Sequence, residues 1–403
     1  MRSEPVLIAG AGPVGVITAL ALAQRDIPVR VFEAGERVND APRASTLHPA
    51  TLEIIANVGL LEEVIAQGLV ARTFQFWDRP ARQLVAEFDH AVLKDDTPYP
   101  FVVQCEQHKV ASIALARLKK FPHAKVYFSS PVTAVTPRED RVEITVDIDG
   151  KPERVSGAYL IGADGGRSLV RKSLRIPFEG YTFPERFLVL TSLFDFAATH
   201  GVAYRAYFSD PDEWANLFKV AGDDGMGRWR SVFPTLPGQT DEAVLNETAT
   251  ESRLQKFFPN DERYEIVHRN IYRVHQRVAA RFREGRVFLA GDSAHVNNPI
   301  GGLGLNCGIH DAAHLAALLS AVLRDERPYS ELDTYDAVRR PMNIEYVQQQ
   351  TIANKKRLEE KDSASRQANF DTLRRTAADP VAHRAFLMRT SLLESVRKRR
   401  DAA

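Results

Sequence analysis

The first hydrophobic run of the chain covers residues 5–9 and contains no charged side chain. Short uninterrupted apolar runs are typical of strands that are buried on both faces of a parallel sheet. A glycine-rich turn over residues 10–15 follows, and the next residues, up to about position 26, have the apolar spacing of a helix. Residues 29–33 form a second apolar run. This order predicts a strand, a helix and a parallel strand at the start of the chain.

The spacing of hydrophobic and polar residues changes twice after this unit. Before residue 184, helices are predicted over 51–70 and 110–121 and strands within 125–161, with a hairpin turn at Asp149-Gly150. Residues 184–275 are dense in aromatic side chains, alternate between polar and apolar positions and give few helix signals, so they predict a mostly antiparallel sheet. The remaining predicted elements are a parallel strand over 286–290, a long helix over 305–324 and an all-helical segment over 330–403.

Composition places this chain of 403 residues among ordinary soluble globular proteins, because 44% of residues are hydrophobic and 26% are charged. The net charge of +1 gives no electrostatic signature for nucleic acid or for an anionic membrane. Two cysteines are too few for a disulfide framework, which favours a cytoplasmic protein. We find no targeting segment and no apolar stretch of 18 residues, so no membrane span is expected.

Three glycines of the first turn have the spacing of a dinucleotide-binding motif. Gly10 permits the tight turn, Gly12 lets a pyrophosphate approach the backbone, and Gly15 lets the helix pack against the strand. The N-terminus of the helix offers free N–H groups to the phosphates. Glu33 closes the second strand, where a carboxylate can accept hydrogen bonds from ribose hydroxyls. The motif predicts dinucleotide binding but does not separate FAD from NAD.

Two further motifs each follow an apolar strand. The second is the run 162–168 (GADGGRS), and the third is the run 291–295 (GDSAH), with a proline and several glycines between 299 and 304. With the first motif they occur in the order found in one family, and the chain resembles the FAD-dependent aromatic hydroxylases, which are the para-hydroxybenzoate hydroxylase-like single-component flavin monooxygenases. The motif of the serine hydrolases is absent, and no cluster of metal-binding residues stands out, so no metal is expected.

The resemblance implies an α/β fold in which a Rossmann-like FAD-binding domain carries an inserted, mostly antiparallel β-sheet domain for the substrate and is followed by a helical C-terminal segment. The expected division is 1–75, 100–183 and 276–330 for the FAD-binding domain, 76–99 and 184–275 for the substrate domain, and 331–403 for the helical segment. That segment either packs on the FAD-binding domain or forms the face of a homodimer.

The resemblance also assigns residues to the cofactor. Those implied to bind FAD are Gly10, Gly12, Pro13, Val14, Gly15, Glu33, Arg43, Gln104, Asp164, Arg167, Asp292, Pro299, Gly302, Leu303, Gly304, Leu305 and Asn306. Asp164 and Arg167 belong to a motif that the family uses for both FAD and NAD(P)H. Because Pro299 cannot donate a hydrogen bond, we expect its carbonyl to be free to face the flavin ring or the substrate. The glycines after it let the backbone approach a flat ring.

The activity that the resemblance implies is a monooxygenation. NAD(P)H reduces a tightly but non-covalently bound FAD, O2 forms a hydroperoxide at flavin C4a, and one oxygen atom passes to the ring of a phenolic or heteroaromatic compound, in particular an aromatic acid. No nucleic acid or membrane partner is expected. Two alternatives stay open at this point. One is a flavoenzyme of the same fold that epoxidises, oxidises or reduces a non-aromatic substrate, and the other is a non-catalytic flavin- or NAD-binding sensor.

The antiparallel region supplies the candidate substrate residues. Period-two alternation puts Arg205 and Tyr207 on one face of their strand and Tyr204 on the other. Arg205 or Arg230 would bind a carboxylate, because a guanidinium matches it with two hydrogen bonds. Tyr204 or Tyr207 would relay the proton of a phenol. The simpler interpretation of either arginine is an exposed residue on a solvated face of the sheet.

Four other features have structural interpretations. We expect His295, early in a helix after the third motif, to be a hydrogen-bonded packing residue rather than a base. Cys105 and Cys307 are expected to be buried, inert thiols. The charged run 355–362 is expected to be the solvated face of a helix.

Overall fold

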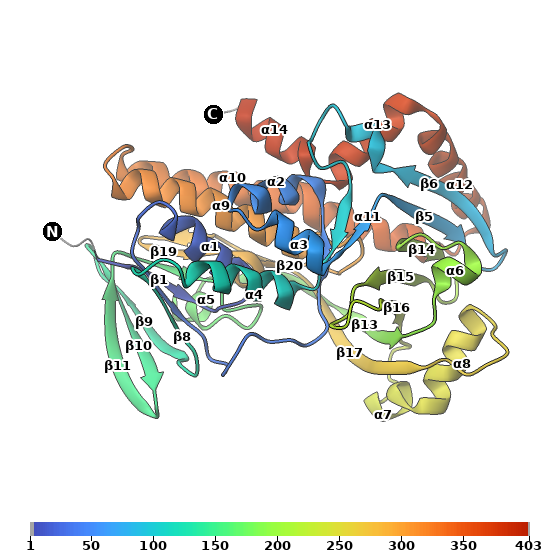
Figure 1. Cartoon of the computed structure of the whole chain (residues 1–403), viewed down its shortest axis with the longest axis horizontal. Coiled ribbons are helices and arrows are strands. Elements are labelled where there is room, and N and C mark those ends of the chain that lie inside the picture. The colour runs from blue at the N-terminus through green and yellow to red at the C-terminus, as the bar shows by residue number, and fades with distance from the viewer. Residues whose placement is uncertain (1–3, 402–403) are drawn as a thin grey trace.

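The computed structural model describes residues 4–401 and contains two large sheets with helices on their outer faces (Figure 1). The first sheet has the order β18-β19-β12-β1-β2-β8, and all its strands are parallel except β18. Its strands are β1 (Val6–Ala9), β2 (Val29–Phe32), β8 (Ala124–Tyr127), β12 (Tyr159–Gly162), β18 (Arg283–Glu284) and β19 (Val287–Leu289). The predicted parallel sheet and its first strand–helix–strand unit are therefore confirmed.

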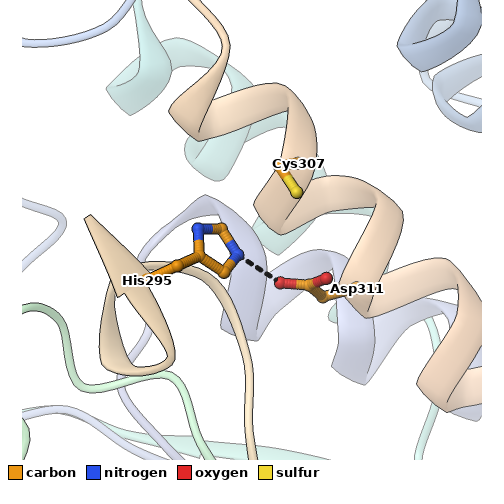
Figure 2. A group of neighbouring side chains, drawn as sticks. All are labelled: His295, Cys307 and Asp311. Carbon is orange, nitrogen blue, oxygen red and sulfur yellow. Dashed lines mark hydrogen bonds and ion pairs between the residues drawn. The ribbon is translucent and has the colours of Figure 1, made fainter. Parts of the chain in front are cut away.

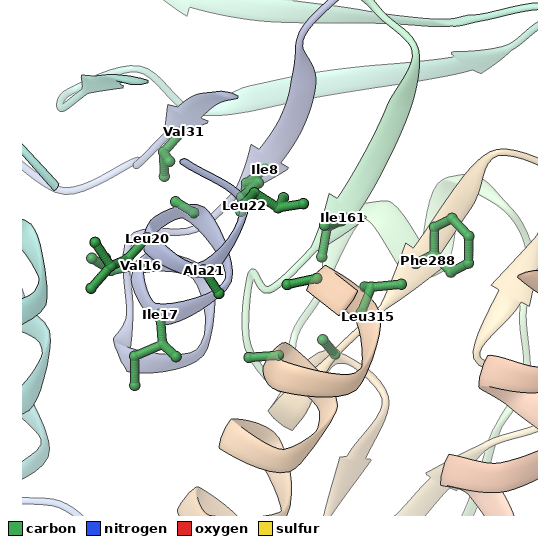
Figure 3. Close-up of a cluster of buried hydrophobic side chains, with 14 of the residues drawn as sticks. Ile8, Val16, Ile17, Leu20, Ala21, Leu22, Val31, Ile161, Phe288 and Leu315 are labelled. Atoms are coloured by element: carbon green, nitrogen blue, oxygen red, sulfur yellow. The ribbon is translucent and has the colours of Figure 1, made fainter. Parts of the chain in front are cut away.

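Three helices cover one face of this sheet. They are α1 (Pro13–Ala23), α4 (Gln107–Leu118) and α9 (Gly304–Leu323), and α1 packs against both of the others. Every residue of α1 from Gly15 to Ala23 is buried, because the sheet lies on one side of the helix and helices lie on the other. Figure 3 shows the resulting core, in which Ile8 and Val31 of the strands meet Val16 and Leu20 of α1. This core fixes the N-terminus of α1 at the carboxyl ends of the strands.

Two small three-stranded sheets flank the parallel sheet. One contains β9 (Val132–Pro137), β10 (Val142–Ile148) and β11 (Lys151–Gly157), and the turn at Asp149-Gly150 has positive φ angles, as a tight hairpin requires. The other contains β3 (Thr46–Leu47), β7 (Val102–Gln104) and β4 (Leu69–Ala71). The short elements near the second and third motifs are α5 (Leu169–Ser173) and η2 (Gly291–Ser293), and η3 (Tyr329–Leu332) follows α9.

The helix predicted over 51–70 is in fact two helices, α2 (Pro49–Asn57) and α3 (Leu61–Gln67). The chain turns between them at Gly59, whose φ of +72° is rarely adopted by other residues. The apolar spacing continues across the break, which is why the sequence alone suggested a single element.

The second large sheet has eight strands in the order β20-β17-β13-β16-β15-β14-β5-β6 and is antiparallel except where β14 pairs with β5. Its strands are β5 (Thr73–Asp78), β6 (Gln83–Asp89), β13 (Phe178–Ser192), β14 (Arg205–Ser209), β15 (Ala215–Val220), β16 (Arg228–Pro234), β17 (Ile266–Ala279) and β20 (His295–Val296). The predicted mostly antiparallel sheet is confirmed.

Three helices interrupt this region, although few helix signals were found in it: α6 (Phe196–His200), α7 (Asp241–Leu245) and α8 (Glu247–Phe257). Side chains of Asp195, Thr240 and Asn246 cap their N-termini. Phe196 and Phe257 belong to a core on one face of the sheet. The prediction underestimated helix here because the aromatic alternation of the strands dominates the local pattern.

The C-terminal segment is helical, as predicted. It contains α10 (Asp333–Asn343), the π-helical η4 (Ile344–Gln348), α11 (Gln349–Leu358), α12 (Ser363–Ala378), α13 (Pro380–Thr390) and α14 (Leu393–Asp401). In Figure 1, α12 and α13 lie beside β5, β6 and the short helix η1 (His90–Leu93), and contacts join α12 to β6 and α13 to η1. The predicted solvated face at 355–362 is wrong in part, because Lys355 and Leu358 are buried, and Lys355 pairs with Glu185 across 2.7 Å.

Across residues 4–401, no helix combines the length and the apolar character that crossing a membrane requires.

Candidate active site

The glycine turn after β1 is a closely packed cradle with one open side. A Cβ on Gly10, whose φ is +101°, would lie 2.4 Å from the Ala163 carbonyl oxygen, and a Cβ on Gly15 would lie 2.0 Å from the Gly10 carbonyl oxygen. A Cβ on Gly12 would meet no atom within 4 Å. Gly10 and Gly15 therefore hold strand and helix together, whereas Gly12 leaves space above the backbone, which is the arrangement that a pyrophosphate needs.

The N-terminus of α1 presents its N–H groups to this space. The first helical hydrogen bond runs from the Val16 N–H to the Gly12 carbonyl, so the N–H groups of Val14 and Gly15 have no partner within the helix. No side chain caps this end, no acidic residue lies in the first turn, and Pro13 occupies the first helical position. An anion is therefore the natural ligand here.

Glu33 is held beside the same turn. Its two carboxylate oxygens accept hydrogen bonds from the Ala11 N–H at 2.7 Å and the Gly35 N–H at 2.9 Å. Each oxygen keeps a further lone pair for a hydroxyl donor. The predicted position of this acid at the end of the second strand agrees with the structure.

The second and third motifs are bonded to each other. Asp164 accepts hydrogen bonds from the Ser168 hydroxyl and the Val170 N–H, so its carboxylate shapes the turn before α5. The Ser293 hydroxyl donates to the Gly162 carbonyl at 2.5 Å. Arg167 and Asp292 are exposed, so both are accessible to a bound nucleotide.

The loop before α9 is a tight turn. The Pro299 carbonyl accepts a hydrogen bond from the Gly302 N–H at 3.0 Å, so our expectation that this carbonyl is free is wrong. The φ angles of Gly301 and Gly302 are +111° and +67°. No side chain caps the N-terminus of α9, which begins at Gly304. The N–H groups of its first turn are therefore available to a ligand, as they are in α1.

Several residues assigned to FAD have their side chains engaged elsewhere. The Asn306 amide donates to the Thr46 and Gly302 carbonyls and accepts from the His48 N–H, so it ties β3 to the loop before α9. The side chains of Leu303 and Leu305 are buried in apolar clusters. These residues can contact a flavin only through their backbone or the edge of the side chain.

Gln104 and Arg43 are two further residues assigned to FAD. Gln104 is fully buried, and its Oε1 accepts a hydrogen bond from the Thr46 hydroxyl at 2.9 Å, whereas its Nε2 has no partner. An amide donor left in this state costs about 1–3 kcal/mol unless a ligand satisfies it. Arg43 is exposed. The open cradle, the uncapped helix and this unpartnered amide together fit FAD.

A buried network of charges lies behind the third motif (Figure 2). His295 donates through Nε2 to Asp311 across 2.7 Å, and the other Asp311 oxygen accepts from Arg339 Nε across 2.7 Å. Burial disfavours the imidazolium, but Cys307 and Asp311 outweigh it and raise the pKa of His295 to about 10. His295, Cys307 and Asp311 are close enough to hold a metal, but Arg339 also contacts the Cys307 sulfur at 3.2 Å. We therefore interpret the group as an ion-pair network.

The structure also tests the expectations for His295 and for the two cysteines. His295 is a hydrogen-bonded packing residue, as predicted, although it lies on the short strand β20 and not in a helix. Cys105 and Cys307 are both buried, and burial raises the pKa of the Cys105 thiol to about 12, which makes that thiol unreactive at neutral pH.

A mainly apolar cavity lies between the eight-stranded sheet, the loop before α9 and the C-terminal helices. Its lining side chains come from seven parts of the chain: His48, Phe74, Phe76, His90, Arg205, Tyr207, Ile300, Leu303, Gln350, Asn354, Leu358, Phe386 and Thr390, together with Gly301. The helical segment thus forms one wall of the cavity, a role that the sequence did not reveal.

Arg205 is the charged residue of this cavity. It is 5% exposed, its Nη2 donates to the Tyr207 hydroxyl at 3.2 Å, and its buried Nη1 has no partner. Among the described residues, no carboxylate lies within ion-pair distance of it. Arg230 is also 5% exposed and donates to the Arg43 carbonyl at 3.0 Å. The interpretation of these arginines as solvated surface residues is wrong, because the C-terminal helices and the FAD-binding part of the chain cover this face.

The two tyrosine candidates separate in the structure as the alternation predicted. Tyr207 lines the cavity beside Arg205. Tyr204 packs edge-on against Trp229 in the core on the other face of the sheet, and Lys219 lies over its ring. The structure therefore brings Tyr207 and not Tyr204 to the cavity.

Two buried histidines of the cavity were missed by sequence reasoning. His48 Nε2 lies 2.9 Å from the Gly301 carbonyl oxygen, and its buried Nδ1 has no partner. Burial, followed by the charge of Arg205, holds the pKa of His48 well below its ordinary value, so the ring is neutral. Burial and Arg205 also lower the pKa of His90 to about 4. Neither residue belongs to a sequence motif, so no local signal could have identified it.

Comparison with known proteins places this architecture in a family. Residues 3–350 match the family described as FAD binding domain. The para-nitrophenol 4-monooxygenase of Pseudomonas sp. (strain WBC-3) is 33% identical over 392 residues, covering 96% of this chain and 94% of the relative. The 6-hydroxy-3-succinoylpyridine 3-monooxygenase HspB of Pseudomonas putida is 35% identical, covering 88% and 89%.

A solved structure agrees with these relatives. The p-nitrophenol 4-monooxygenase PnpA from Pseudomonas putida DLL-E4 superposes with a TM-score of 0.90 at 31% identity, covering 96% of this chain and 97% of that one. The chain belongs to the FAD-binding family of aromatic hydroxylases and is an FAD-dependent aromatic-ring monooxygenase. The resemblance inferred from the three motifs is confirmed.

Proposed function

We propose that the protein uses NAD(P)H and O2 to hydroxylate a phenolic or heteroaromatic ring that carries an anionic substituent, and that the ring binds in the cavity at Arg205. The observation that carries this proposal is a buried guanidinium with an unpartnered Nη1 and no carboxylate partner among the described residues. A buried charge of this kind is costly unless an opposite charge approaches it. A carboxylate of the substrate would supply that charge, and the partly negative oxygens of a nitro group would accept hydrogen bonds from the same guanidinium.

His48 is the group that we assign to the substrate hydroxyl. When Nε2 donates to the Gly301 carbonyl, Nδ1 carries a lone pair, and this lone pair is buried with no partner in the protein. It can accept the hydrogen bond of a phenol, which polarises the O–H bond and raises the electron density of the ring. His48 is neutral at physiological pH because its pKa is lowered, so it is in the accepting form.

Aromatic and aliphatic side chains supply the rest of the cavity. Phe74 and Phe76 belong to the same apolar cluster as Leu303, and the guanidinium of Arg205 lies over the ring of Phe74 at 5.1 Å. These side chains would hold a flat ring and exclude water from it. Bound FAD, reduced by NAD(P)H, supplies the activation of O2. The residues of this chain position the substrate, hold its charge and accept the hydrogen bond of its hydroxyl.

The relatives support the substrate class. Their names describe enzymes that act on para-nitrophenol, on a hydroxypyridine and on a hydroxyphenylpropionate. Each of these compounds combines a ring hydroxyl with a nitro, keto-acid or carboxylic acid substituent. This combination matches His48 and Arg205 as the two polar ends of an otherwise apolar cavity.

The test is a turnover assay on the purified holoenzyme. NADH or NADPH oxidation and oxygen uptake are followed with 4-nitrophenol, 4-hydroxybenzoate, 6-hydroxynicotinate and uncharged 4-methylphenol, and products are analysed by mass spectrometry. We expect faster oxidation with at least one of the three compounds that carry a carboxylate or nitro group, a product with one added oxygen atom, and little stimulation by 4-methylphenol. Stimulation by 4-methylphenol alone, or by none of the four compounds, would contradict the proposal.

A further inference from the structure

The helical segment that forms one wall of the cavity changes pitch just before it reaches the cavity. Residues Ile344–Gln348 are π-helical between the α-helices α10 and α11, and Pro341, which has no N–H group, lies shortly before them. A π-turn contains one residue more than an α-turn and often occurs at functional sites. The extra residue shifts the phase of α11, so that Thr351 and Lys355 are buried while Gln350 and Asn354 line the cavity.

Gln348, at the end of the π-helical segment, and Gln350, two residues later, differ in how their side-chain amides are hydrogen-bonded. The Gln348 amide is fully used: its Oε1 accepts from Gln276 Nε2 at 2.6 Å, and its Nε2 donates to the Val296 carbonyl at 3.1 Å. The Gln350 amide lies two residues later, and its buried Oε1 accepts no hydrogen bond. Gln348 therefore fixes the helix in place, whereas Gln350 presents an unused acceptor at the cavity.

Gln350 lies on a helix that is bonded to the same loop as His48. Asn354, one turn further along α11, donates to the Ile300 carbonyl at 3.4 Å, and the next residue, Gly301, bonds His48. The helix face that carries Gln350 is thus fastened to the same loop that holds His48. A buried amide oxygen without a donor costs about 1–3 kcal/mol, and a ligand that donates to it recovers this cost.

We propose that Gln350 is a specificity-determining residue, whose Oε1 accepts a hydrogen bond from a second donor on the substrate ring. Such a donor is a second ring hydroxyl, in addition to the one that donates to His48. This inference rests on the proposed function and adds to it, because Arg205 and His48 alone would not separate a dihydroxylated ring from its monohydroxylated analogue. A site that offers a buried acceptor discriminates strongly against the analogue that lacks the donor.

The test uses pairs of compounds that differ by one donor. The first pair is 3,4-dihydroxybenzoate and 4-hydroxybenzoate, which has a C–H in place of the second hydroxyl. The second pair is 4-nitrocatechol and 4-nitrophenol. Dissociation constants are measured on the oxidised holoenzyme from the change in flavin absorbance, and KM and kcat are measured separately. The variant is Gln350→Met, and the matched control is Gln349→Met, because Gln349 is exposed on the same helix.

We expect Gln350→Met to weaken binding of the donor-bearing compound about 10-fold and to change binding of its partner less than about 2-fold. Gln349→Met should change neither, and Gln350→Glu, which keeps an acceptor oxygen, should restore the ratio between the two compounds. Equal losses for both members of a pair would assign Gln350 a packing role and overturn the inference. If the wild-type enzyme binds only the donor-free members, the inference fails and the proposed function stands. If it binds no member of either pair, both fail.

Discussion

The nucleotide cradle and the substrate cavity are built in different ways. The cradle is formed by Gly10, Gly12, Gly15 and Glu33 within one strand–helix–strand unit, and its contacts are mostly between backbone atoms. The cavity takes side chains from seven parts of the chain between His48 and Thr390. The cradle therefore depends on local steric fit, which few sequences satisfy, whereas the cavity depends on how distant elements are brought together and can change one side chain at a time. This difference explains how one cofactor site can serve enzymes that act on many substrates.

The largest effect is expected where the cradle is packed most closely. Gly15→Ala places a Cβ 2.0 Å from the Gly10 carbonyl oxygen, so we expect unfolding to become easier by at least about 3 kcal/mol and FAD to be lost. Gly12→Ala meets no protein atom within 4 Å. It should leave the melting temperature of the FAD-free protein unchanged while weakening FAD binding, as measured by flavin fluorescence. Equal melting temperatures for the two variants would show that the cradle is not packed as described.

The second prediction concerns the charged end of the substrate cavity. Arg205→Met should lower kcat/KM for an anionic phenol about 1000-fold, because the substrate charge loses its buried partner. FAD binding and the melting temperature should not fall, because the variant removes a buried charge that has no ion-pair partner among the described residues. The control is Arg230→Met, which removes the bond to the Arg43 carbonyl and should affect the FAD-binding loop more than the selectivity for charge. If the two variants have the same selectivity for anionic over neutral phenols, Arg205 does not bind the anionic group of the substrate.

His48→Asn tests the other polar end of the cavity. We expect kcat to fall about 100-fold, because the ring hydroxyl loses its hydrogen-bond acceptor. Because the pKa of His48 is held well below its ordinary value, the ring stays neutral as the pH falls through 6.5. The acid limb of the wild-type pH–rate profile should therefore lie below the usual histidine range. A limb centred near 6.5 would show that this imidazole is charged in the resting enzyme or is not the acceptor.

The smallest effect concerns stability and not catalysis. The pKa of His90 is about 4 in the folded protein and about 6.5 when it unfolds, so the unfolded chain binds the proton more tightly between these values. Stability is thus fully present above pH 6.5 and is lost as the pH falls toward 4. At pH 5 the loss from this residue is about 2 kcal/mol. His90→Gln should have a flatter dependence of melting temperature on pH, and an unchanged slope would contradict the assignment.

The same contrast decides what the sequence could predict. The three motifs and the period-two alternation of 204–207 depend on neighbouring residues, so the FAD-binding fold, the sheet and the orientation of Arg205 and Tyr207 followed from them. His48 and Gln350 are single residues whose roles arise only when β3, the loop before α9 and α11 meet. Lys355 was predicted to be solvated because its ion-pair partner Glu185 lies far away in the sequence, so the residues around Lys355 give no sign of the pairing. The Pro299 carbonyl was expected to be free because the turn that engages it depends on the conformations of two glycines.

The most direct test of the account is a crystal structure of the FAD-bound enzyme in complex with an anionic phenol that it hydroxylates. We predict that the anionic group lies within hydrogen-bond distance of Arg205 Nη1, that the ring hydroxyl lies within hydrogen-bond distance of His48 Nδ1, and that Phe74 and Phe76 contact the ring. A complex with the substrate bound at Arg230, or outside the cavity between the sheet and the C-terminal helices, would contradict it.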